Sequence, residues 1–161
     1  MMTKTVGKIM TKLQVLFLCT GNYYRSRFAE EYFNYRAPAV INNWRSFSRG
    51  LAAQSDMDAS SGNPGPISIH ALHYLNLYQI KTQNILRYPL SVTPQDFEKA
   101  DHIVALSKTE HKNVIAALYP QYEHLVHYFV IEDIHISKPE YAMPRLIHNV
   151  DKLMNDLTQR M

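Results

Sequence analysis

The chain has 161 residues, 46% of them hydrophobic, which is enough material for one compact domain with a substantial core. Its formal charge of +3 favours anionic ligands, but it lacks the dense Lys/Arg tracts of a nucleic-acid-binding protein. No segment approaches the roughly 20 apolar residues of a membrane span, and a single cysteine excludes both an intramolecular disulfide and a cysteine-rich zinc site.

Residues 1–12 carry lysines but have neither the apolar core nor the cleavage site of a signal peptide. We therefore expect a short N-terminal tail, then one domain over residues 13–161, and a location in the cytoplasm.

The first predicted strand is the apolar run at residues 14–18, and Gly21 and Asn22 shortly after it mark a tight loop. An amphipathic helix is predicted from Ser26, with Pro38 ending it.

A second strand is predicted over residues 44–48, because apolar and polar residues alternate there. Residues 51–66 are rich in small and polar residues and predict a long surface loop. A second helix begins near Ile69, and residues 78–94 show no clear period.

A third strand is predicted over residues 102–106, and Ser107 with Glu110 directly after it matches the capping box of a helix. Residues 126–131 predict a fourth strand, and Pro144 predicts the first turn of a last helix. Strands separated by helices indicate an α/β fold with a parallel sheet, whose ligands bind at the carboxyl ends of the strands.

The chemistry is concentrated in the loop after the first strand, where Arg25 follows Cys19 by six positions. Such a loop can curl its N–H groups around a tetrahedral anion, and the dipole of the next helix favours a thiolate at Cys19. The planar fork of Arg25 can hold two phosphoryl oxygens, and the Ser26 hydroxyl can donate to the sulfur. The residues predicted to bind phosphate are Thr20, Gly21, Asn22, Tyr23, Tyr24 and Ser26.

The segment Val15–Ser26 resembles the N-terminal signature of the low-molecular-weight protein tyrosine phosphatases. Further segments resemble later parts of the family in the same order: Ser48–Gly50, Gly62–Pro64, Ala100–Ile103 and Ile131–Asp133. The resemblance implies a single three-layer α/β domain, with a four-stranded parallel sheet flanked by helices and the phosphate-binding loop after the first strand. It also implies that neither a metal nor an organic cofactor takes part.

The resemblance further implies a two-step hydrolysis of a phosphorylated protein or a small phosphomonoester. Cys19 attacks the phosphorus while Asp133 protonates the leaving group, and Asp133 then activates water. Ser48 is expected to bond Asn22 and support the loop. Weaker candidates for the acid are Asp96, Asp101 and Glu132.

Several positions depart from the family pattern. Ile134 replaces the usual proline after the acid, which leaves the rigidity of that loop open. Tyr24 stands where many members have a second cysteine, and Arg27 replaces a proline and adds a cation near the mouth. No histidine that would support the phosphate loop follows the second helix, where Asn84 and Ile85 stand. The expected pocket has few aromatic walls, so a preference for phosphotyrosine stays open, as does the oligomeric state.

Other interpretations remain beside the phosphatase. The loop could serve a catalytically weak phosphate-binding regulatory module, and an inert buried cysteine is the plain alternative. Arsenate reductase on the same scaffold needs further cysteines, which this chain lacks. His70 with His73, and His124 with His127, have helical spacing but no third ligand, so they predict no metal site.

Overall fold

The computed structural model describes residues 5–6, 9–53 and 63–160. Gly62 and most of the predicted surface loop, residues 54–61, lie outside the described residues. Part of the predicted tail forms a two-stranded antiparallel pair, β1 (Thr5–Val6) with β2 (Ile9–Met10).

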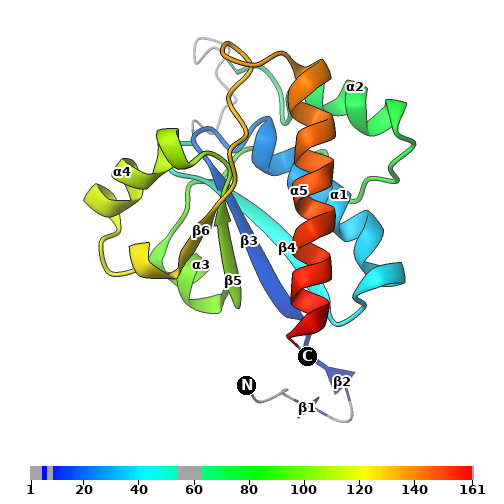
Figure 1. Ribbon diagram of the computed structural model, residues 1–161, viewed down its shortest axis with the longest axis vertical. Helices are drawn as coiled ribbons and strands as arrows, with labels where there is room; N and C mark the ends of the chain where they lie inside the picture. Colours follow the sequence, from blue (N-terminus) through cyan, green and yellow to red (C-terminus); the bar gives the residue numbers. More distant parts are fainter. Residues whose placement is uncertain (1–4, 7–8, 54–62, 161) are drawn as a thin grey trace.

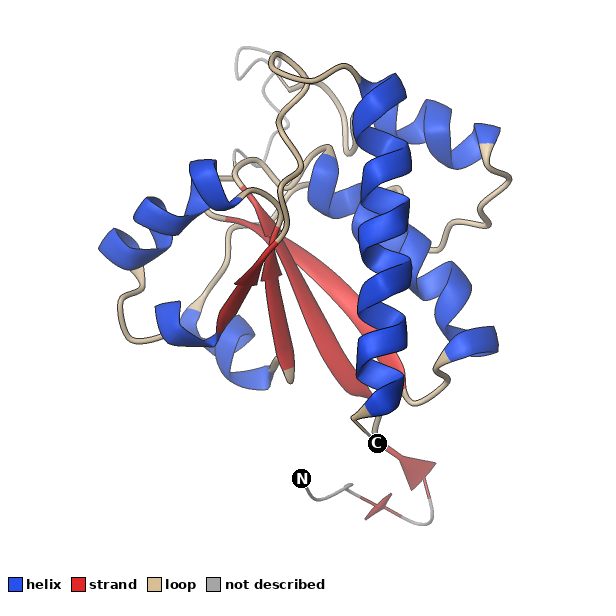
Figure 2. Cartoon of the chain, in the orientation of Figure 1, coloured by secondary structure: helices blue, strands red, loops and turns tan. Residues whose placement is uncertain are grey.

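The centre of the fold is a sheet of four strands in the order β4-β3-β5-β6, and every neighbouring pair is parallel (Figure 2). The strands are β3 (Leu13–Cys19), β4 (Trp44–Gly50), β5 (His102–Ala105) and β6 (Val126–Tyr128). The predicted fold class, an α/β domain around a four-stranded parallel sheet, is confirmed.

Five α-helices are described, with a short 3₁₀ turn at Glu123–Leu125. They are α1 (Arg25–Val40), α2 (Ile69–Leu77), α3 (Pro94–Lys99), α4 (Lys108–Leu118) and α5 (Pro139–Gln159). Helices α1 and α5 cover one face of the sheet, while α3 and α4 lie on the other (Figure 1). No helix in the described part of the chain is both long and apolar enough to cross a membrane.

The alternation of side chains along β3 gives each face its own core. Val15 and Phe17 pack with residues of α1 and α5, whereas Leu16 and Leu18 pack with residues of α3 and α4. All four are fully buried, as expected for a central parallel strand covered on both sides.

Two predicted helix boundaries were wrong, and one helix was not predicted. Helix α5 begins at Pro139, so Pro144 lies inside it. Helix α1 continues past Pro38 to Val40. Because Pro38 has no N–H, it cannot donate to the Asn34 carbonyl one turn earlier in the helix. The Gln83 side chain donates to this carbonyl instead, at 3.4 Å. Helix α3 was not predicted, because its six residues are too few to show a period.

Candidate active site

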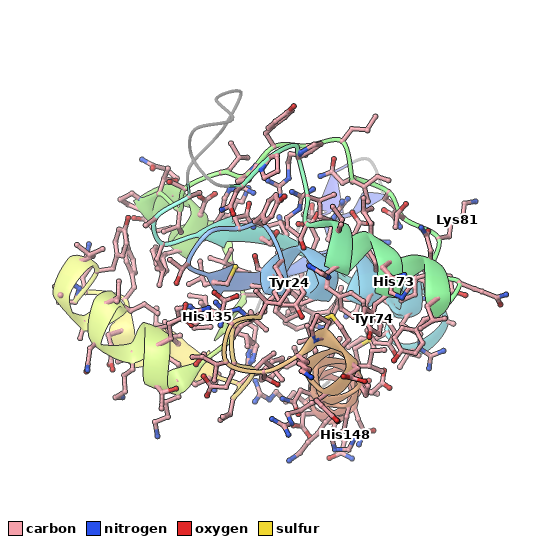
Figure 3. All side chains as sticks on the ribbon, turned by 90° about the horizontal axis from the view of Figure 1, so that it is seen from above. Tyr24, His73, Tyr74, Lys81, His135 and His148 are labelled. Atoms are coloured by element: carbon pink, nitrogen blue, oxygen red, sulfur yellow. The ribbon has the colours of Figure 1, made fainter. Side chains whose placement is uncertain are left out.

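A cavity of about 440 Å³ at the carboxyl edge of the sheet brings together Cys19, Arg25 and Asp133. Cys19 ends β3, Arg25 begins α1, and Asp133 follows β6. Figure 3 looks onto this end of the molecule, with Tyr24 near its centre. Thr20, Gly21, Tyr23 and Tyr24 also line the cavity. The lining residues that the sequence did not predict are Ala52, Asn63, Ser68, His70 and Ile134.

The turn of the phosphate loop depends on Asn22, which is fully buried and has a φ of 52°. Its side-chain oxygen accepts from Arg87 Nη1 and from the Leu90 N–H, both at 3.0 Å. Its side-chain nitrogen donates to Ser26 Oγ and to Ser48 Oγ, both at 2.9 Å. The predicted bond between Ser48 and Asn22 is therefore present, and all four partners hold the amide in one orientation.

The orientation of the Asn22 amide determines where the hydroxyl hydrogen of Ser26 points. Because Ser26 Oγ already accepts from Asn22, its own hydrogen is available to Cys19 Sγ, which lies 2.9 Å away. Cys19 and Ser26 are both buried, and no other cysteine exists in the sequence. The serine is placed to stabilise negative charge on the sulfur.

A buried ion pair beneath the loop was missed from the sequence. Arg87 Nη2 lies 3.2 Å from Glu30 Oε1 and also donates to Ser48 Oγ at 3.1 Å. Glu30 in turn accepts from Ser48 Oγ at 2.6 Å. Arg87 lies in the segment after α2, where no supporting histidine could be identified, and it supports Asn22 directly and through Ser48.

Gly50 is needed where β4 ends against the loop. A Cβ atom there would lie 2.7 Å from the Thr20 carbonyl oxygen and 3.0 Å from the Asn22 nitrogen. Both are backbone atoms of the phosphate loop, so they could not give way without changing its shape. This contact gives a physical reason for the glycine in Ser48–Gly50.

The guanidinium of Arg25 is held by the carboxylate of Glu110, which the sequence predicted only as part of a helix capping box. Arg25 Nη1 and Nη2 donate to the two oxygens of Glu110, at 3.0 Å and 2.9 Å, and Nη1 also donates to the Ile131 carbonyl at 3.1 Å. The buried Nε of Arg25 has no partner among the described residues. An unpartnered buried N–H beside an open cavity is a ready donor for an anion.

Glu110 is itself fixed by its neighbours. It accepts from Thr20 Oγ1 and lies 3.0 Å from His111 Nε2. His111 Nδ1 accepts from the Ser107 N–H at 3.1 Å, so Nε2 carries the ring proton of the neutral imidazole. Burial alone would raise the pKa of Glu110, but hydrogen bonds from His111, Arg25 and Thr20 hold it well below its usual value. Glu110 is therefore a permanent anion and not a proton donor.

The capping box predicted at Ser107 is only half formed. Ser107 Oγ accepts from the Glu110 N–H at 3.3 Å, and α4 begins there as expected. The Glu110 carboxylate turns away from the helix end and binds Arg25 instead. A complete capping box is present at Thr93 and Asp96, where α3 begins.

The loop that carries Asp133 forms a closed turn without a proline. The Asp133 carbonyl accepts from the Ile136 and Ser137 N–H groups, both at 2.9 Å. Its side-chain Oδ1 accepts from the Ile134 N–H at 2.9 Å and lies 3.8 Å from Arg25 Nη2. The carboxylate thus faces the guanidinium across the cavity.

Two further expectations can be compared with the structure. Arg27 does not lie near the mouth: it is fully buried and donates to the carbonyls of Pro66 and Asn84, at 2.7 Å and 2.9 Å. Burial and the nearby Arg87 lower its pKa to about 10. Few aromatic walls were expected, yet Tyr23 and Tyr24 both line the cavity; Tyr23 donates to the Pro64 carbonyl, and Tyr24 is buried.

The weaker acid candidates are engaged elsewhere. Asp96 caps α3 and pairs with Arg49, Asp101 accepts from the Gln14 N–H at the opposite end of the sheet, and Glu132 accepts from Thr109. Among the described residues, no three His, Cys, Asp or Glu side chains are grouped so that they could hold a metal ion.

Comparison with known proteins identifies the family and the fold of the chain. The family model described as low molecular weight phosphotyrosine protein phosphatase matches residues 14–159. A low molecular weight protein tyrosine phosphatase from T. tengcongensis is 24% identical, with a TM-score of 0.71 over 93% of this chain and 100% of that chain. YfkJ from Bacillus subtilis is 16% identical, with a TM-score of 0.77 over 93% and 97% of the two chains.

A third structure, YwlE arginine phosphatase from Geobacillus stearothermophilus, is 21% identical, with a TM-score of 0.71 over 92% of this chain and 94% of that chain. A search of curated proteins finds no match. The similar structures show a common fold, and the family model covers nearly the whole described domain.

Proposed function

Because the chain belongs to the family of low molecular weight phosphotyrosine protein phosphatases, we propose that it hydrolyses phosphomonoesters through a cysteinyl-phosphate. In this proposal Cys19 is the nucleophile, Arg25 clamps the phosphoryl group, and Asp133 is the general acid and base. The observation that carries it is the unpartnered Nε of Arg25 at the cavity that Cys19 and Asp133 also line.

In the first step the Cys19 sulfur attacks phosphorus, a P–S bond forms, and the P–O bond to the leaving group breaks. Asp133 gives its proton to the leaving oxygen. The N–H groups from Thr20 to Ser26 and the Arg25 fork stabilise the equatorial oxygens of the phosphoryl group.

In the second step water attacks phosphorus while Asp133 takes its proton. The P–S bond breaks and the sulfur leaves as a thiolate, which accepts the Ser26 hydrogen at 2.9 Å. Inorganic phosphate then leaves the loop.

Phosphotyrosine is the side chain that the cavity favours within this proposal. Tyr23 and Tyr24 line it and are the aromatic residues nearest to a phenolic leaving group in this proposal. The protein would act on phosphorylated proteins or small phosphomonoesters in the cytoplasm. Since YwlE is named an arginine phosphatase, phosphoarginine is the substrate to test beside phosphotyrosine.

The test is steady-state hydrolysis of para-nitrophenyl phosphate between about pH 4.5 and pH 8, followed by phosphotyrosine and phosphoarginine peptides. We expect an acidic optimum, no turnover for Cys19→Ser, and a loss of about a hundredfold or more for Asp133→Ala. Glu132→Ala, next to the acid, is the matched control and should keep its activity. A parent that binds phosphate through the loop without turning over substrate would instead make the chain a phosphate-binding module.

A further inference from the structure

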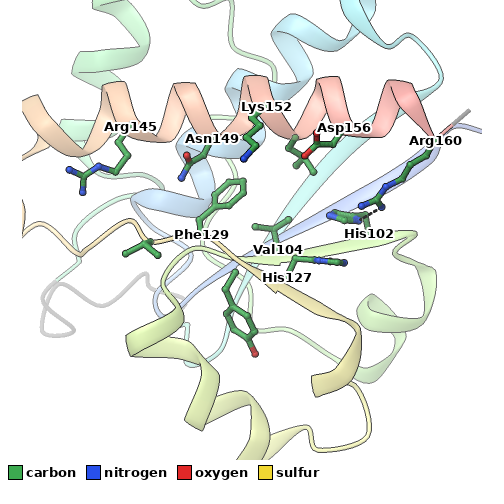
Figure 4. A pocket seen from close by; sticks show the side chains of 12 residues that line it. His102, Val104, His127, Phe129, Arg145, Asn149, Lys152, Asp156 and Arg160 are labelled. Carbon is green, nitrogen blue, oxygen red and sulfur yellow. Dashed lines mark hydrogen bonds between the residues drawn. The ribbon is translucent and has the colours of Figure 1, made fainter.

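A second cavity lies between α5 and the neighbouring strands β5 and β6, away from the phosphate loop (Figure 4). Its volume is about 450 Å³, close to that of the candidate active site, and the two cavities share no lining residue. This volume falls within the range of sites for small organic molecules.

One wall of this cavity is a polar stripe of α5. Arg145, Asn149, Lys152 and Asp156 follow one another at intervals of three or four residues, and Arg160 continues the stripe past the end of the helix. Figure 4 shows these side chains in a row above the strands. The stripe is separate from the apolar face of α5, which packs into the core.

None of the three cations of the stripe has an acidic partner among the residues that the structure describes. Neither Arg145 nor Lys152 forms an ion pair within the described part of the chain, and Arg160 contacts His102 Nδ1 at 3.4 Å. Asp156 is likewise outside ion-pair distance of any described cation. The cavity therefore offers free positive charge together with one free carboxylate.

The floor of the cavity is aromatic and uncharged. The rings of His102 and His127 stack with their centroids 4.3 Å apart and their planes 13° apart. Burial, His127 and Arg160 lower the pKa of His102 to about 4, and burial and Arg160 also lower the pKa of His127. Both imidazoles are neutral at neutral pH, and Phe129 continues the apolar floor.

We propose that this cavity is a nucleotide-binding site. The base stacks on the imidazole pair, the phosphates bind Lys152 and Arg160, and Asp156 with Asn149 accepts from the ribose hydroxyls. Each kind of side chain in the lining then meets a matching group of the ligand.

An acidic peptide fits the same cations less well. It could bind the cations, but it would present no flat ring to the stacked imidazoles. Inorganic phosphate would use the cations but neither the floor nor Asp156. The combination of cations, one carboxylate and a flat neutral platform favours the nucleotide.

The test is calorimetric titration of ADP into the full-length Cys19→Ser variant, which prevents turnover. We expect a Kd below about 1 mM, and binding about tenfold weaker in Lys152→Glu and in Arg160→Glu. His127→Ala should weaken ADP binding and leave any binding of inorganic phosphate unchanged. Lys81→Glu carries the same charge change on an exposed lysine beyond α2 (Figure 3) and should leave the Kd unchanged.

A further variant, Arg25→Ala, separates this cavity from the phosphate loop and should keep the affinity for ADP. The proposal is overturned if ADP does not bind, or if Arg25→Ala removes binding while Lys152→Glu does not. It is also overturned if tripolyphosphate binds as tightly as ADP and His127→Ala has no effect, because the cavity would then select only charge. Thermal unfolding of each variant shows whether it is folded. None of these outcomes depends on whether Cys19 is a nucleophile.

Discussion

Glu110 binds both terminal nitrogens of Arg25, at 3.0 Å and 2.9 Å, and leaves Nε as the nitrogen of that side chain without a partner among the described residues. The guanidinium is therefore fixed before any phosphate arrives. Such preorganisation avoids the cost of orienting a long side chain during the reaction.

Glu110→Gln removes this anchor while keeping the size of the side chain. The amide can accept only one of the two guanidinium bonds, so we expect kcat/KM for para-nitrophenyl phosphate to fall about tenfold to a hundredfold. Glu123→Gln is the control, because Glu123 pairs at 3.0 Å with Lys112, away from the cavity. A gain of activity in Glu110→Gln would contradict the prediction, since it would mean that Glu110 competes with phosphate.

Arg87→Met should damage both the fold and the phosphate loop. It leaves Glu30 as an unpaired buried carboxylate, so we expect a loss of about 2 to 4 kcal/mol in the free energy of unfolding, together with a fall in kcat. The double variant Arg87→Met/Glu30→Gln should recover part of the stability and none of the activity, because Asn22 still lacks its donor. Arg45→Met, at an exposed arginine, is the control, and urea unfolding of all four proteins is the measurement. Equal stability of the single and double variants would rule out the ion pair as the cause.

Peroxide should inactivate the protein without a protecting disulfide. Cys19 is the only thiol in the sequence, so its sulfenic acid has no second thiol with which to form a disulfide, and we expect further peroxide to oxidise it to the sulfinic acid. Intact-mass spectrometry after peroxide treatment should show this irreversible form, whereas Tyr24→Cys should show a disulfide that dithiothreitol reverses. Recovery of the oxidised parent with no thiol added would contradict this expectation.

His102 makes stability depend on pH. Its pKa is lowered from 6.5 to about 4, so between these values the unfolded chain binds the proton and the native protein does not. Stability should therefore fall as the pH is lowered from about 6.5 to about 4, by at most about 3 kcal/mol from this residue.

Urea unfolding across that pH range compares the parent with His102→Asn, whose profile should be flatter. His148→Asn, at an exposed position on α5, is the control and should follow the parent. Parallel profiles for the parent and His102→Asn would show that the burial of His102 does not have this effect.

The parts of the site that were predicted from the sequence depend on which residues follow each strand along the chain. Cys19 and Arg25 lie on one short loop, and Asp133 follows a strand whose carboxyl end must lie at the same edge of a parallel sheet. The position of Ser48 follows from the same rule. These residues could be placed at the same edge of the sheet without knowing the order of its strands.

The parts that were missed depend on contacts between distant segments. Glu110 fits a capping box in its local sequence, and only the pairing of β3 with β5 brings it to Arg25. Arg87 lies in a segment without a period, so nothing local marks its role. Arg27 was expected near the mouth because it directly follows Ser26, yet the carbonyls that accept from it come from two other loops.

The bonds of Asn22 also set an order of assembly. Its side chain is held by Ser26 in α1, Ser48 in β4, and Arg87 and Leu90 in the segment that precedes α3. A nascent chain that has emerged only to residue 80 contains the whole phosphate-loop sequence but lacks two of the partners that shape it. Affinity for phosphate would therefore appear only in the second half of synthesis, after the residues around 90 have joined β4.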